Sequence, residues 1–141
     1  MPTETSSYQR VNTLSVLGNT VSLVKTGYTF AGWNTPANGS DTDDAANATF
    51  SMGTANATLY AKWTANPTYA VTYNGNGSTG GTVPTDSNSY QQGNTVTVLG
   101  NTGTLVKTGY TFAGWNTAAN GSGTDYAANA TFSMGTANAT L

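Results

Sequence analysis

The stretch that decides the fold occupies residues 25–35 and reads Lys-Thr-Gly-Tyr-Thr-Phe-Ala-Gly-Trp-Asn-Thr. The same residues return unchanged at 107–117, which is 82 positions further along a chain of 141 residues. Extending this alignment outward without a gap pairs residues 1–59 with 83–141 and gives identity at 46 of 59 positions. Duplication on this scale is typical of repeat proteins, in which each copy is one small structural unit. The chain is therefore predicted to be an array that serves as a spacer or multiplies a binding surface.

The quoted stretch has the alternating pattern of a β-strand, with aromatic residues interleaved with small ones. Regular alternation places Tyr28 and Phe30 on one face and Trp33 on the other, and residues 110–115 repeat this arrangement. Further strands are expected at 59–63, 69–73 and 95–98, where β-branched and aromatic types alternate. No stretch has a convincing helical stripe. The predicted fold class is mainly β.

Two tandem repeat units are expected, comprising a first unit at 1–64, a linker at 65–68 and a second unit at 69–141. Residues 60–82 occur only once, yet each unit needs an opening strand like 69–73 and a closing strand like 60–63. The first unit is thus expected to lack its opening strand and the second its closing strand, as in a piece cut from a longer array. Unpaired edges accept strands from other molecules. We therefore expect association through sheet edges, with other repeats of the array or with neighbouring chains.

Composition argues against most catalytic and metal chemistry. The chain has no histidine and no cysteine, so it lacks the usual general base, the thiolates and the commonest zinc ligands. Charged residues make up 7% and the net charge is −2, which leaves no basic surface for nucleic acid. No apolar run is long enough for direct membrane insertion. A non-enzymatic chain without cofactors is expected, and its surface of Thr, Asn, Ser, Gly and Ala predicts an extracellular or cell-surface location.

Two runs carry a family resemblance, Gly-Tyr-Thr-Phe-Ala-Gly-Trp-Asn-Thr at 27–35 and Ala-Thr-Phe-Ser-Met-Gly-Thr-Ala-Asn-Ala-Thr-Leu-Tyr-Ala-Lys-Trp at 48–63. They resemble the Listeria-Bacteroides repeat, the family that contains the B-repeat of internalin B. The resemblance spans essentially the whole chain and implies β-grasp-like small mixed sheets within bacterial or archaeal surface proteins. It also implies a stalk, spacer or adhesion role, with no catalytic residue. Asp44 departs from the pattern where the second unit has Tyr126, which predicts a less well packed first unit.

Aromatic side chains are expected to be the structural anchors of both units. The set is Tyr28, Phe30, Trp33, Phe50 and Trp63 in the first unit, and Tyr110, Phe112, Trp115, Tyr126 and Phe132 in the second. Two alternatives use the same features differently. Exposed aromatic faces can stack on sugar rings, which would make the chain a glycan-binding module with a host or matrix partner. Open sheet edges would instead make it a segment of an extracellular filament assembled by strand complementation.

Two polar groupings are weaker candidates for chemistry. Asp41, Asp43 and Asp44 offer the oxygen ligands that calcium prefers, but their spacing is not that of an EF-hand loop and the second unit does not reproduce it. A solvated turn is the simpler interpretation, so no metal site is assigned. The lysines at 25, 62 and 107 lie in an Asn-rich chain, which leaves open an isopeptide bond assisted by a carboxylate.

Overall fold

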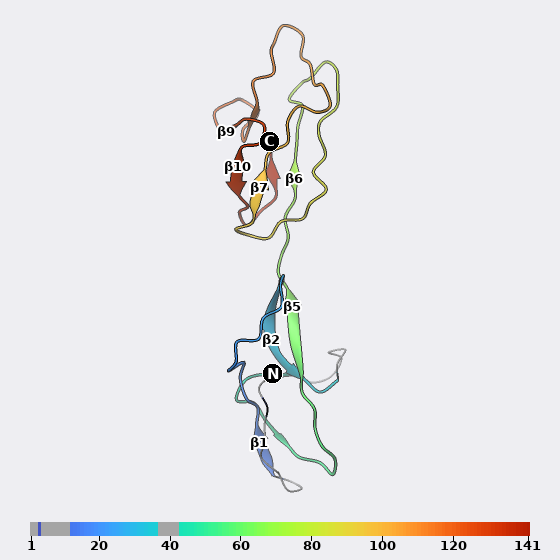
Figure 1. The fold of residues 1–141 in the computed structure, drawn as a ribbon, viewed down its shortest axis with the longest axis vertical. Coiled ribbons are helices and arrows are strands. Elements are labelled where there is room, and N and C mark those ends of the chain that lie inside the picture. The colour runs from blue at the N-terminus through green and yellow to red at the C-terminus, as the bar shows by residue number, and fades with distance from the viewer. Residues whose placement is uncertain (1–2, 4–11, 37–42) are drawn as a thin grey trace. The chain divides into compact units, whose positions relative to one another are not determined.

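The computed structural model describes residue 3 and residues 12–36 and 43–141 (Figure 1). Internal contacts divide the chain into two compact units, Met1–Asn66 and Pro67–Leu141, called unit 1 and unit 2 below. Both units are built from short strands joined by turns, and no helix occurs among the residues that the structure describes. The prediction of a mainly β chain is confirmed.

The described residues of unit 1 form two antiparallel sheets. Its strands are β1 Thr13–Ser15, β2 Tyr28–Asn34, β3 Asp43–Asp44, β4 Thr49–Ser51 and β5 Tyr60–Ala65. One sheet pairs β1 with β4 and sets Leu14 opposite Phe50. The other has the order β3-β2-β5, so that β2, the quoted stretch, is its central strand. Figure 1 shows β2 and β5 side by side over their length.

Unit 2 contains three two-stranded sheets, one parallel and two antiparallel. Its strands are β6 Val71–Thr72, β7 Thr95–Thr97, β8 Trp115–Asn116, β9 Asp125–Tyr126, β10 Thr131–Ser133 and β11 Ala139–Thr140. β6 runs parallel to β11, while β7 pairs with β10 and β8 with β9 in the antiparallel sense. The expected small sheets are therefore present, but the parallel and antiparallel pairings lie in separate sheets and not within one mixed sheet. The strands predicted at 59–63, 69–73 and 95–98 correspond to β5, β6 and β7.

The regular alternation predicted for the quoted stretch is interrupted by a β-bulge. The ladder between β2 and β5 shifts register between Phe30 and Gly32, so Ala31 is an extra residue. Gly32 makes this possible because its φ of 126° is one that other residues rarely adopt. The extra residue turns Phe30 and Trp33 to the same side, where their ring centroids are 5.3 Å apart. The prediction that these two rings lie on opposite faces is wrong.

The two units differ in how much apolar surface they bury. Unit 2 has a contiguous core made of Val71, Tyr73, Val96, Val98, Leu105, Trp115, Met134 and Leu141. Among the described residues of unit 1, the buried hydrophobic side chains are Val16 and Trp33. Leu59 matches Leu141 in the alignment but is only half-buried. In unit 2, β6 pairs with β11 directly before Leu141 and helps to bury it. The described part of unit 1 contains no strand in the matching place beside Leu59.

Candidate functional site

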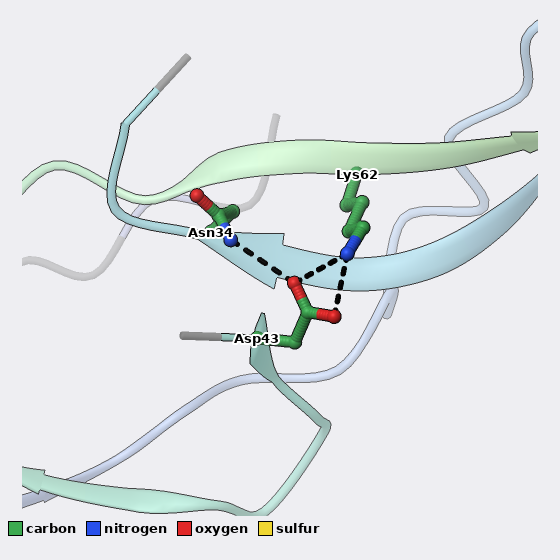
Figure 2. A network of polar contacts seen from close by, with 3 residues as sticks. All are labelled: Asn34, Asp43 and Lys62. Carbon is green, nitrogen blue, oxygen red and sulfur yellow. Dashed lines mark hydrogen bonds and ion pairs between the residues drawn. The ribbon is translucent and has the colours of Figure 1, made fainter. Parts of the chain in front are cut away.

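A polar network joins the three strands of the larger sheet in unit 1 (Figure 2). The Lys62 ammonium on β5 donates to both carboxylate oxygens of Asp43 on β3, at 2.6 Å and 2.5 Å. Asn34, at the end of β2, donates its side-chain amide to the same carboxylate at 3.0 Å. The Asp43 carboxylate therefore receives charge-assisted hydrogen bonds from β2, the strand beside it, and from β5, on the far side of β2.

The network is partly open to solvent, with the Lys62 and Asp43 side chains 33% and 53% exposed. The hydrogen bond from Lys62, supported by that from Asn34, lowers the pKa of the Asp43 carboxyl below 3.8. An exposed pair of this kind is screened by water and adds little to stability. The contact of Lys62 with both carboxylate oxygens spans β2 and connects the two outer strands of the sheet, β3 and β5.

The Lys62→Gln variant is expected to raise the pKa of Asp43 toward 3.8, because the largest cause of the lowering is removed. A depressed folded pKa gives stability that is present above the unfolded value and is lost as the pH falls through the folded value. The wild type should therefore lose the stability contributed by the ionised Asp43 carboxylate as the pH falls below 3.8. The variant should show little of this pH-dependent contribution. Carboxyl carbon NMR titration of both proteins measures this. The matched control is Lys25→Gln, and an unchanged Asp43 pKa in the Lys62 variant would contradict the assignment.

The three residues of the weak calcium candidate, Asp41, Asp43 and Asp44, do not share one environment. Asp41 lies outside the described residues, while Asp43 is engaged by Lys62 and Asp44 stands opposite Trp33 in the ladder. No group of three or more acidic, His or Cys side chains suited to a metal occurs in the part of the chain that the structure describes. A cation at Asp43 would have to displace Lys62. The same carboxylate stays ionised at neutral pH and holds Lys62 as an ion pair, which is an unfavourable state for attack by the lysine on an amide.

The two matching tryptophans occupy equivalent buried positions. Trp33 is 5% exposed and Trp115 is 4% exposed. Each indole N–H donates to a backbone carbonyl, that of Leu17 in unit 1 and that of Leu99 in unit 2, both at 2.8 Å. Burial with a satisfied polar tip is how tryptophan contributes most to packing. Neither indole lies bare at the surface, where it could stack on a ligand.

The other expected anchors fall into contacts of two kinds. Phe30 packs edge-on against both Trp33 and Trp63, with centroid distances of 5.3 Å and 5.6 Å. In unit 2 the Tyr126 and Phe132 rings are tilted and 5.2 Å apart. The matching place in unit 1 holds Asp44, so position 44 supplies no ring to the half-buried Phe50.

Three of the expected anchors lie at the surface. Tyr28 is 40% exposed, Phe112 is 43% exposed and Tyr110 is 74% exposed. Lysine ammonium groups lie over the two tyrosine rings, Lys25 at 4.2 Å from Tyr28 and Lys107 at 5.0 Å from Tyr110. The greater exposure in unit 2 has a physical cause. No strand covers residues 110–114 there, whereas β5 covers the identical residues in unit 1.

The sequence interpretation named Lys62 only for the open isopeptide bond and missed its ion pair with Asp43. A signal was available in the alignment. Asn34 and Asp43 recur as Asn116 and Asp125, whereas Asp41 and Asp44 are replaced in the second copy. The acidic residue with a structural partner is thus the one that both units keep.

None of the described residues forms a helix of the length and apolarity that crossing a membrane requires. Two similar proteins come from Evansella cellulosilytica. One, named "Putative Gly-rich membrane protein", is 43% identical over 124 residues, covering 84% of this chain and 14% of its own length. The other, named "Putative membrane protein", is 38% identical over 123 residues, covering 83% of this chain and 17% of its own length. The chain thus spans less than a fifth of these relatives.

No solved structure matches the chain closely enough to report. The sequence profile of the Listeria-Bacteroides repeat domain matches residues 3–62 and again residues 69–141, which together are nearly the whole chain. The two matches coincide with the duplicated sequence and fall within the two compact units. The chain therefore belongs to the Listeria-Bacteroides repeat family, of which it carries two tandem copies.

Proposed function

We propose that the chain is a non-enzymatic, extracellular repeat module that acts as a spacer or stalk segment of a larger surface protein. The observation that carries this proposal is the duplication of one small β unit with its packing residues, while neither copy contains a histidine or a cysteine. Trp33 and Trp115 are the most deeply buried aromatic side chains of the described residues, and both serve packing. The residues that recur between the units are thus those that stabilise the fold.

Two further observations support a place within a larger surface protein. The relatives carry the word membrane in their names, and the region similar to this chain is a small part of each. The described residues also supply few cationic side chains that could attract a polyanion, since three lysines stand among them. Repeats of this kind extend a chain by stacking small folded units.

A replacement experiment in the full-length protein tests the spacer role. Deleting both units is expected to impair the surface display of the flanking regions, and replacing them with an unrelated β module of equal length is expected to restore it. Antibody labelling of intact cells that produce the protein measures display in each case. Labelling that requires permeabilised cells would overturn the extracellular location. Failure of the length-matched replacement would instead assign the chain to adhesion, through a protein or glycan partner.

A further inference from the structure

The parallel strand pair of unit 2, β6 with β11, connects the two points at which tension along the chain would reach this unit. Its register sets Val71 opposite Ala139 and Thr72 opposite Thr140. β6 is the first strand of unit 2 in the sequence, and β7, β8, β9 and β10 all lie between it and β11. Tension that passes through unit 2 therefore enters at the start of β6 and leaves after β11. Because the two strands run in the same direction, these points lie at opposite ends of the pair, and tension slides one strand past the other.

Backbone hydrogen bonds join the two strands along their whole length. The Ala139 N–H donates to the Ala70 carbonyl at 3.0 Å. The Leu141 N–H donates to the Thr72 carbonyl at 2.9 Å, and the Leu141 carbonyl accepts from the Asn74 N–H at 2.7 Å. Bonds in a parallel ladder are evenly spaced along the strands. Sliding therefore strains these bonds together, whereas pulling the strands apart from one end would break them one after another.

Side-chain contacts reinforce the pair on both sides of the ladder. The Asn138 Oδ1 accepts from the Ala70 N–H at 2.9 Å. The Thr72 hydroxyl donates to the Ala139 carbonyl at 3.3 Å, and its oxygen lies 3.1 Å from the Thr140 hydroxyl oxygen. These contacts join the same two segments as the backbone bonds, so they must also break before the strands can slide by one residue.

The inner face of the pair is closed by the core of unit 2. Val71, Tyr73 and Leu141 are buried and belong to the contiguous core of that unit. Water therefore cannot reach the hydrogen bonds from this side and replace them as they lengthen. Sliding also withdraws apolar side chains from the core, which adds the cost of exposing them to water. Rupture of the pair is thus coupled to disruption of the core.

We propose that unit 2 is a load-bearing module in which the β6–β11 pair acts as a mechanical clamp. While the pair holds, tension passes from β6 directly to β11, and the strands between them in the sequence carry none of it. Whatever sequence follows Leu141 leaves this geometry unchanged, because tension that arrives from there enters β11 in the same direction. The inference deepens the proposed stalk role and rests on that role for the source of the tension.

Single-molecule force spectroscopy on the full chain tests the clamp. The chain has no cysteine, so introduced cysteines define where the load is applied. Handles at Thr68→Cys and at a cysteine added after Leu141 load the pair by sliding. Handles at Thr68→Cys and Thr136→Cys load the same pair from one end only. Unit 2 is expected to unfold at higher force in the sliding arrangement at every loading rate, and equal forces in the two arrangements would overturn the proposal.

Two variants of the pair test which contacts resist the load. Asn138→Ala removes the acceptor for the Ala70 N–H and should raise the unfolding rate under a given sliding load about fivefold, as the net contribution of one hydrogen bond implies. Thr140→Val keeps the shape of the side chain, removes one hydroxyl of the outer contact and should act in the same direction. Urea titration of each variant verifies that unit 2 is folded before the force measurement.

The matched control is Thr79→Val, which removes a hydroxyl that lies 3.2 Å from that of Thr108, away from the parallel pair. It should leave the unfolding rate under sliding load unchanged. A rise as large as that for Asn138→Ala would show that resistance belongs to the unit as a whole, which would overturn the clamp. Surface labelling is independent of these forces. Equal forces with normal display would remove the clamp alone, and labelling only after permeabilisation would remove the extracellular location alone.

Discussion

The Trp115→Ala variant is expected to lose about 3–5 kcal/mol of unit 2 stability, which is the usual cost of truncating a buried tryptophan. Trp115 is 4% exposed and packs against Tyr73 at 4.7 Å and Phe112 at 5.2 Å. The Leu99 backbone forms hydrogen bonds with both Trp115 and Tyr73. Its carbonyl accepts from the Trp115 indole and its N–H donates to the Tyr73 hydroxyl, both at 2.8 Å. Removing the indole therefore leaves a cavity and an unsatisfied carbonyl together.

Amide NMR signals followed through a urea titration measure the two units separately in one sample. The Trp115→Ala variant should show an early transition for unit 2 amides and an unchanged midpoint for unit 1 amides. Trp33→Ala is the matched control and should reverse that order, because it truncates the equivalent side chain in the other unit. A common transition for all amides in both variants would show that the units unfold as one. A loss below about 1 kcal/mol for Trp115→Ala would contradict its place as the centre of the core.

The sequence predicted the elements that depend on short-range patterns. Alternation of aromatic or β-branched residues with small ones located β5, β6 and β7, because side-chain period and strand propensity act within a few residues. The bulge at Ala31 was not predictable in the same way. A single extra residue reverses the faces that follow it, and its presence depends on a ladder with β5, which lies about thirty residues away.

The candidate site likewise depends on contacts between residues that are far apart in the sequence, which local patterns do not predict. Lys62 and Asp43 are not neighbours in the chain, and only the order β3-β2-β5 brings them together. The exposure of Tyr110 and Phe112 likewise follows from the absence of a ladder partner, since the identical stretch in unit 1 is covered. Identical local sequences therefore have different surroundings, which no local pattern can distinguish.

A second large effect is expected where the two copies differ in sequence at positions 21 and 103. Gly103→Val, which introduces the residue found at position 21, should destabilise unit 2 by about 3 kcal/mol, at the upper end of overpacking costs. A Cβ on Gly103 would lie 2.0 Å from the carbonyl oxygen of Thr82, a distance that no rotamer can relieve. The Thr82 N–H donates to the Gly103 carbonyl at 2.9 Å, so the two backbones are held in direct contact.

The reverse change in unit 1 provides the matched comparison. Val21 is 54% exposed, so Val21→Gly should cost about 0.5–1 kcal/mol, mainly through the greater flexibility of glycine in the unfolded chain. Gly103→Ala separates two explanations for a loss in Gly103→Val. Because the obstructing atom is the Cβ itself, alanine should cost nearly as much as valine, whereas a clash made only by the γ-methyl groups would spare alanine. Urea titrations resolved by unit measure all three variants, and a well-tolerated Gly103→Ala would show that segments 79–82 and 103–106 do not approach each other this closely. A large loss in both Gly103 variants would instead show that glycine is required at position 103 because the backbone of Thr82 passes directly against it.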